Sequence, residues 1–226
     1  FSCLSVMKHE SMNSTAFDLA IFDQTIWGYS QGENLFNTAR GMVLLGDHAH
    51  PILFLVAPLY WIWDNVSTIL IFQTLCIALS AIPLFLIAKK ALGSETSALF
   101  ISIGYLCYPC IHYINLFDFH PAALAILPFM LAIHFARERK YGLFLASIIM
   151  ASTAKEHFPI IMAMFGLYIG IIQRKKKFGA LVFAGGLSWL VFNLKFLMPH
   201  FSEIEEYAHI SGYEQVLSSP LSALLQ

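Results

Sequence analysis

The sequence predicts an all-α protein, a polytopic bundle of about six transmembrane helices, each needing about 20 apolar residues to cross a bilayer. Of its 226 residues, 58% are hydrophobic and only 12% are charged, whereas a soluble domain carries about 25% charge. The mean hydropathy is +0.68. The net charge of −1 gives no general attraction to nucleic acid, so no nucleic-acid partner is expected.

Six apolar stretches are the expected membrane helices: 66–88, 97–114, 122–136, 142–154, 158–172 and 178–198. Several are shorter than a full span, so they depend on their flanks or do not cross completely. The stretch 51–63 is too short to cross and predicts an interfacial or re-entrant helix, with Trp61 and Trp63 in the headgroup zone.

Three regions follow from this pattern. Residues 1–65 form an exterior region with interfacial helices, 66–198 form the helix bundle, and 199–226 begin a further exterior loop. The chain starts without Met and stops in mid-pattern, so we expect it to be a piece of a longer protein.

The basic residues predict the orientation of the bundle. Nine of the 13 Lys and Arg residues fall in alternate joints between the spans: Lys89, Lys90, Arg137, Arg139, Lys140 and 174–177. By the positive-inside rule these joints are cytoplasmic. The region 1–65 and the other joints then share one exterior face.

Four motifs lie on that exterior face. They are FDLAIFDQTIW (17–27), LGDHAHP (45–51), FDFHP (117–121) and AKEHFP (154–159). The basic residues that predict the orientation lie outside the four motifs. Their convergence on one face therefore indicates a site.

The motif residues suit phosphate and a cation. Proline is favoured at the first position of a helix, so His50 and His120 are expected beside helix N-termini, which favour anions such as phosphate. Carboxylate and imidazole groups also bind divalent cations such as Mg²⁺ or Mn²⁺. The candidate ligands are Asp47, His48, His50, Asp118 and His120.

Asp18 and Asp23 are five residues apart, which separates them by about 140° on a helix. We therefore expect one to face the site and the other to cap or anchor the segment. Lys155 and Glu156 interrupt apolar sequence on both sides, and charges so placed usually face a cavity or a partner. Lys155 is expected to pair with Glu156 or to bind a substrate phosphate. Each motif also has a plainer interpretation as a solvated turn, a helix cap or a structural ion pair.

The order of the four motifs resembles the DUF2079 family of predicted prokaryotic membrane proteins, from about Ser14 to Pro199. The expected first transmembrane helix of that family is missing here. His157 stands where an acid is common in the family, which puts a catalytic role for His157 in doubt but not one for Glu156. The resemblance implies an integral protein of the prokaryotic cytoplasmic membrane, with the motif face exterior.

DUF2079 is in turn distantly similar to the GT-C glycosyltransferases, which use polyprenyl-phosphate sugars. That similarity implies a GT-C-like bundle and a catalytic acid in the first exterior loop, where Asp18 and Asp23 lie. It also implies a second acid in the FDFHP loop. Analogy of fold does not by itself establish function.

The resulting hypothesis is sugar transfer from a polyprenyl-phosphate donor, held in the membrane lipid, to an exterior acceptor. Asp18 or Asp23 would act as general base, and Lys155 and Glu156 would lie at the substrate phosphate. Two alternatives remain open. One is a transporter or ion-handling protein with an exterior Asp/His site, and the other is a non-catalytic membrane assembly protein. The sequence names no protein partner.

Overall fold

The structure is a computed structural model that describes residues 1–14, 16–33 and 35–202. Most of the exterior loop predicted from residue 199 therefore lies outside the described residues. The N-terminal part contains α1 (Ser2–Glu10), α2 (Ala16–Gln31), β1 (Phe36–Asn37), β2 (Met42–Val43), α3 (Leu44–Asp47), α4 (Leu53–Val56) and the 3-10 helix η1 (Ala57–Trp61). The two strands pair antiparallel, with Phe36 opposite Val43.

The remainder of the described chain is helical. Its elements are α5 (Ser67–Leu79), α6 (Ala81–Leu92), α7 (Glu95–Leu106), α8 (Pro109–Leu116), α9 (Pro121–Leu124), α10 (Ile126–Arg137), α11 (Tyr141–Ser152), α12 (Phe158–Ile171), α13 (Lys176–Phe192), the π-helical η2 (Asn193–Leu197) and α14 (Met198–Phe201). The predicted predominance of helix is confirmed. The short strand pair was not predicted.

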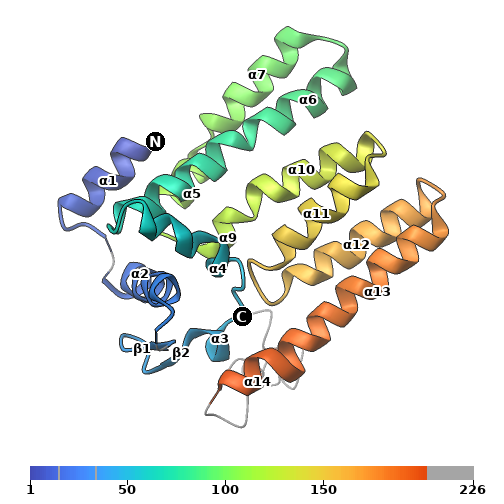
Figure 1. The fold of residues 1–226 in the computed structure, drawn as a ribbon. Coiled ribbons are helices and arrows are strands. Elements are labelled where there is room, and N and C mark those ends of the chain that lie inside the picture. Colours follow the sequence, from blue (N-terminus) through green and yellow to red (C-terminus); the bar gives the residue numbers. More distant parts are fainter. Residues whose placement is uncertain (15, 34, 203–226) are drawn as a thin grey trace, which may run out of the picture.

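Three helical hairpins point in one direction. The pairs α6/α7, α10/α11 and α12/α13 pack side by side, with their connecting loops at the same end of the molecule (Figure 1). The hairpin loops turn through left-handed residues, Gly93, Arg139 and Arg174. At the first of them, Ser94 caps α7 by accepting a hydrogen bond from the Ser97 N–H at 3.2 Å.

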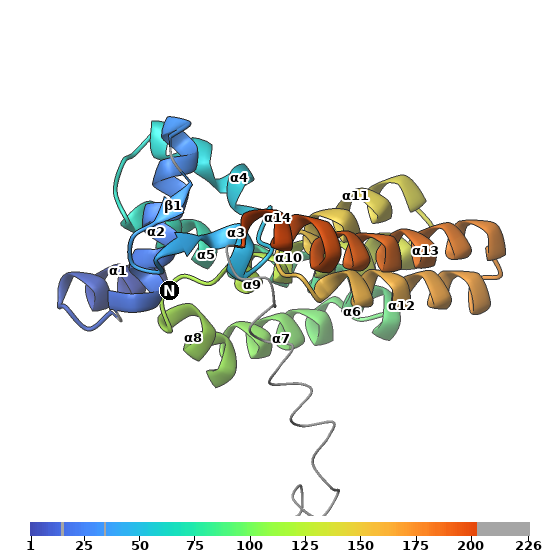
Figure 2. The ribbon, with the colours of Figure 1, turned by 90° about the horizontal axis from the view of Figure 1, so that it is seen from below.

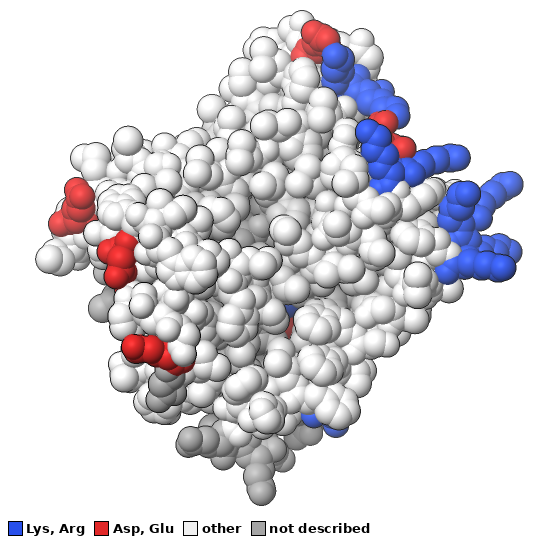
Figure 3. Space-filling view, viewed as in Figure 1, with Lys and Arg blue, Asp and Glu red and all other residues white. Residues whose placement is uncertain are grey.

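The loops of these hairpins carry most of the basic side chains. Figure 3 shows Lys and Arg gathered over the hairpin loops, and the surface over the helices almost free of charge. Cations at the C-terminal ends of helices are favoured by the helix dipole. We call this the basic end. The opposite end, which holds α1 to α4 and the joints 117–120 and 153–157, is the motif end (Figure 2).

The six predicted stretches all form helices, but six full spans are not confirmed. Ser67–Leu92 and Lys176–Phe201 are each 26 residues long and apolar enough to cross a membrane. Glu95–Leu106 and Pro109–Leu116 add a third span only if their 43° bend is counted within it. The helix α11 has 12 residues and is about 18 Å long, against a hydrocarbon core of about 30 Å.

Segment 51–63 differs from the single interfacial helix predicted for it. A turn at Pro51 is followed by the short α4 and then by η1, which has Pro58 near its start. Trp61 and Trp63 are exposed, as a position in the headgroup zone requires. Leu53 and Val56 turn inwards and join a core with Ile26, Leu70 and Phe119. This core joins α2, α4 and α5 at the motif end.

Glycines bring α12 and α13 into backbone contact. A methyl group added to Gly179 would lie 2.5 Å from the Cα atom of Gly170, and one added to Gly166 would collide with the backbone of Phe183. Small residues at such positions let membrane helices pack closely. Gly142 and Gly104 have open space around them instead.

We expect Gly179→Ala to destabilise the protein by about 1–3 kcal/mol, because the backbones must separate to admit the methyl group. Gly104→Ala is the matched control, also within a helix, and its better helix propensity should leave stability unchanged or raise it. The measurement is thermal unfolding of the detergent-solubilised protein. Equal melting temperatures for the two variants would contradict the close packing of α12 on α13.

Candidate functional site

Asp18 lies in the first turn of α2, where a carboxylate is favoured by the helix dipole. Its Oδ2 atom is 3.9 Å from Nε2 of His120, and both side chains are about one-third exposed. This distance permits an electrostatic attraction but is too long for a hydrogen bond. The first and third motifs therefore meet at this point.

The FDFHP turn has an unusual backbone. Asp118 has φ of 83°, a left-handed conformation that costs energy for a residue with a side chain. The Lys8 ammonium group donates to Asp118 Oδ1 at 3.0 Å and to the Leu116 carbonyl at 2.7 Å. His120 occupies the position before α9, with Pro121 at the first helical position, as predicted, and its side chain makes no capping hydrogen bond. Asp118 is thus held by a cation of the protein itself.

Gln73 also holds this turn, and sequence analysis missed it. The residue is on α5 and is fully buried. Its side chain accepts a hydrogen bond from the His120 N–H at 2.7 Å and donates one to the Asp118 carbonyl at 2.8 Å. The available signal was a glutamine within an apolar span, since polar groups are costly there.

In the second motif, Asp47 and His50 make different kinds of contact. Asp47 accepts two hydrogen bonds from Arg40, at 2.6 and 3.0 Å, in a bidentate ion pair. His50 is buried, and its Nδ1 donates to the Ala154 carbonyl at 2.7 Å. This bond places the ring proton on Nδ1 and leaves Nε2 as an acceptor. Burial lowers the pKa of His50 to about 4, so the ring is neutral at neutral pH.

Glu156 of the fourth motif pairs with His48 rather than with Lys155. Nδ1 of His48 is 3.2 Å from Oε1 of the carboxylate. Burial by itself raises the pKa of Glu156, but the hydrogen bonds from His48 and from its own backbone N–H outweigh that effect and lower the pKa to about 2. The group is ionised, yet its Oε2 atom is buried without a hydrogen-bond partner among the described residues.

Lys155 supplies a positive charge to this cluster. Burial lowers the pKa of both His120 and His50, and the charge of Lys155 lowers both further, whereas Asp18 raises that of His120. Within the described part of the chain, the ammonium group has no carboxylate at ion-pair distance. A cation surrounded by largely neutral imidazoles suits a small anion.

Together these contacts bring all four motifs to one place, which we call the motif cluster. Phe22, which belongs to the first motif on α2, contacts the second and third motifs. Its ring centroid lies 5.8 Å from that of His50 and 5.8 Å from that of His120. The cluster consists of Asp18, His48, His50, His120, Lys155, Glu156 and His157.

Asp23 faces a different place from Asp18, as their spacing predicts. Its Oδ1 atom accepts a hydrogen bond from the Tyr60 hydroxyl at 2.5 Å. Burial raises the pKa of Asp23, and Tyr60 partly offsets this. The residue borders a pocket of about 410 Å³ that is also lined by His9, Met12, Ser14, Leu19, Ala20 and Val66.

The five predicted cation ligands do not form a ligand set in this structure. Asp47 and Asp118 are bound to Arg40 and Lys8. No three metal-ligating side chains of the described residues are close enough together to hold one ion. The divalent cation stays a prediction.

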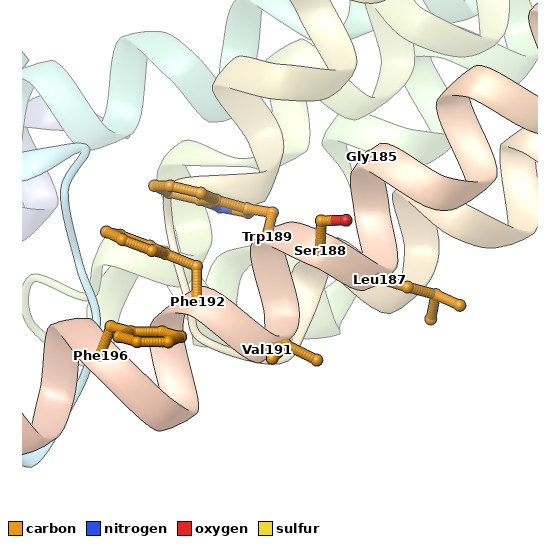
Figure 4. A pocket seen from close by; sticks show the side chains of 7 residues that line it. All are labelled: Gly185, Leu187, Ser188, Trp189, Val191, Phe192 and Phe196. Carbon is orange, nitrogen blue, oxygen red and sulfur yellow. The ribbon is translucent and has the colours of Figure 1, made fainter.

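An apolar pocket of about 720 Å³ borders α13 and is lined by Gly185, Leu187, Ser188, Trp189, Val191, Phe192 and Phe196. Figure 4 shows the rings of Trp189, Phe192 and Phe196 stacked along one side of the helix. The Trp189 indole N–H lies 3.4 Å from the carbonyl of Ser152. The pocket therefore lies beside the turn that carries Lys155.

Comparison with known proteins agrees with the motif pattern. The family described as "Predicted membrane protein (DUF2079)" matches residues 8–226. The chain belongs to this family. No curated protein and no solved structure matches it. The apolar helices fit a membrane protein of the DUF2079 family, and its activity has to be argued from the motif cluster.

The buried His50 predicts how stability depends on pH. Its pKa falls from 6.5 to about 4 on folding, so the folded state favours the neutral ring. The free energy of unfolding carries the full benefit of this preference above pH 6.5. As the pH falls towards 4, the protein loses about 3 kcal/mol of stability, because the unfolded chain takes up a proton that the folded state resists. His50→Asn, whose amide can still donate to Ala154, should flatten the fall in melting temperature over this interval.

His134→Asn, on α10 near the basic end, controls for replacing a histidine as such and should keep the wild-type slope. A wild-type slope in His50→Asn would contradict the assignment of a buried, neutral His50.

Proposed function

We propose that this DUF2079 protein is a membrane glycosyltransferase that moves a sugar from a polyprenyl-phosphate donor to an acceptor on the exterior face. One observation carries the proposal. An acid, Asp18, and a cation, Lys155, both act on His120 in a cluster beside apolar helices, and among the described residues Lys155 has no carboxylate at ion-pair distance. A substrate with a lipid chain and a phosphate group needs apolar helices for the chain and a charged cluster for the phosphate.

The carboxylate of Asp18 would be the general base. It would take the proton of the acceptor hydroxyl while that oxygen attacks the anomeric carbon of the sugar. The bond from this carbon to the lipid-phosphate oxygen breaks in the same step. Asp23 is assigned an anchoring role, because Tyr60 already occupies one of its oxygens.

The leaving lipid phosphate gains negative charge as that bond breaks. Lys155 would stabilise this charge, and neutral His120 and His157 could donate hydrogen bonds to the phosphate. The hydrocarbon chain of the donor would lie along the aromatic pocket of α13, which borders the turn before Lys155. The basic end would face the cytoplasm by the positive-inside rule.

We propose a role for Glu156 that differs from the one expected from the sequence. An ionised carboxylate repels phosphate, so it does not suit the substrate phosphate. Its Oε2 atom, which has no hydrogen-bond partner among the residues that the structure describes, suits a hydrogen-bond donor instead. We assign Glu156 to the hydroxyl groups of the sugar, with His48 fixing the orientation of its carboxylate.

The test uses membranes that contain the full-length protein and a panel of radiolabelled polyprenyl-phosphate sugars. We expect Asp18→Asn to lower turnover by about 100-fold or more, the usual effect of losing a general base. Asp23→Asn is the matched variant and should keep most of the activity. A parallel assay with chelator tests the predicted cation.

The outcomes separate the alternatives. Loss of turnover in Asp23→Asn but not in Asp18→Asn would reverse the assignment of the base. No turnover by folded wild-type protein with any donor would contradict the transferase and favour the transport or assembly hypotheses.

A further inference from the structure

A single buried glutamine bridges two backbone groups of the FDFHP turn. Gln73 has no exposed surface, and both ends of its amide are used. The oxygen accepts from the His120 N–H at 2.7 Å, and the nitrogen donates to the Asp118 carbonyl at 2.8 Å. A hydrophobic side chain of similar volume would fill the same space at less cost to a membrane helix.

These two hydrogen bonds hold the backbone of Asp118 and His120, and His120 belongs to the motif cluster. Asp118 has the left-handed φ of 83°, which persists only where the surroundings hold it. The next residue but one, His120, must direct its ring towards Asp18. The Gln73 amide fixes the backbone on both sides of the intervening Phe119, whose fully buried ring packs against Phe22.

We infer that Gln73 is a positioning residue: from within a membrane helix it sets the FDFHP turn so that the His120 ring lies beside Asp18 in the motif cluster. It touches no reacting atom and acts through the backbone of residues 118–120. Its importance for turnover rests on the proposed function, but the geometric claim does not.

Three substitutions at this position separate hydrogen bonding from packing. Gln73→Leu keeps the approximate volume and removes both bonds. Gln73→Glu keeps an acceptor for the His120 N–H, and when protonated it also keeps a donor for the Asp118 carbonyl. Gln73→Asn keeps the amide but is one methylene too short to reach both groups.

The chain also provides a matched control. Gln173, near the basic end, has the same bonding pattern: it donates to the Ala136 carbonyl at 2.8 Å and accepts from the Tyr141 hydroxyl at 2.8 Å. Gln173→Leu therefore removes two comparable bonds from the same protein, far from the motif cluster.

The experiment is hydrogen exchange of the His120 amide in the full chain, resolved to single residues and run beside the transfer assay. We expect Gln73→Leu and Gln73→Asn to speed this exchange by about tenfold or more, because a buried donor loses its partner. Gln73→Glu should restore slow exchange, and Gln173→Leu should leave it unchanged. The variants with faster exchange should turn over more slowly, with a fall in kcat rather than a rise in KM.

Slow exchange of His120 in both Gln73→Leu and Gln73→Asn would overturn the inference, whatever the transfer assay gives. Should Gln73→Leu fail to fold, the comparison of Gln73→Asn with Gln73→Glu decides in the same way. Fast exchange in these variants, together with no transfer by the wild type, would uphold the positioning role and contradict only the proposed function.

Discussion

The cost of burying a carboxylate governs the motif end of this protein. A buried ion without a partner costs several kcal/mol, and three motif carboxylates are buried here: Asp47, Asp118 and Glu156. Each is paired with another side chain: Lys8 and His48 come from distant parts of the chain, and Arg40 lies seven residues before Asp47. The first two pairings fix α1 against the FDFHP turn and the second motif against the fourth, and Asp18 and Phe22 connect the first motif to both.

The same balance explains why Lys155 is distinctive. Nine of the chain's 13 basic residues belong to the basic end, Lys8 and Arg40 neutralise motif carboxylates, and Lys195 is exposed on η2. Lys155 lies among imidazoles that burial keeps largely neutral, with no carboxylate in the described chain at ion-pair distance. A protein seldom places such a charge beside apolar helices unless an anion or a substrate engages it. The placement of Lys155, rather than the likeness of the motifs to a superfamily, is the physical support for the proposed phosphate-bearing substrate.

Sequence reasoning located the helices and the separate basic and motif ends, because hydropathy and basic joints record both directly. It also separated Asp18 from Asp23, since helical geometry depends only on their spacing. The number of full spans was beyond it, because composition does not show whether a helix shorter than the bilayer crosses it. The ion pairs of Asp47 and Asp118 were also not predicted: tertiary structure brings Lys8 to Asp118, and the connection between β1 and β2 brings Arg40 to Asp47.

Gln73 shows the limit most clearly. In the sequence it is a polar residue within an apolar helix. Only the fold shows that its side chain makes two hydrogen bonds to the backbone of the FDFHP motif, which begins more than 40 residues later in the chain, with Asp118 45 residues away. The two short strands escaped notice for a similar reason, since two residues give no alternating pattern to detect.

The convergence of the four motifs is the central claim, and cysteine cross-linking in native membranes tests it most directly. The four native cysteines are first replaced by serine, and then two pairs are introduced: Asp18→Cys with His120→Cys, and His48→Cys with Glu156→Cys. A pair that joins opposite ends of the molecule, His120→Cys with Lys176→Cys, is the control. The account predicts that a short bifunctional maleimide links both motif pairs and not the control. Failure to link either motif pair in folded protein would show that the motifs do not form one site.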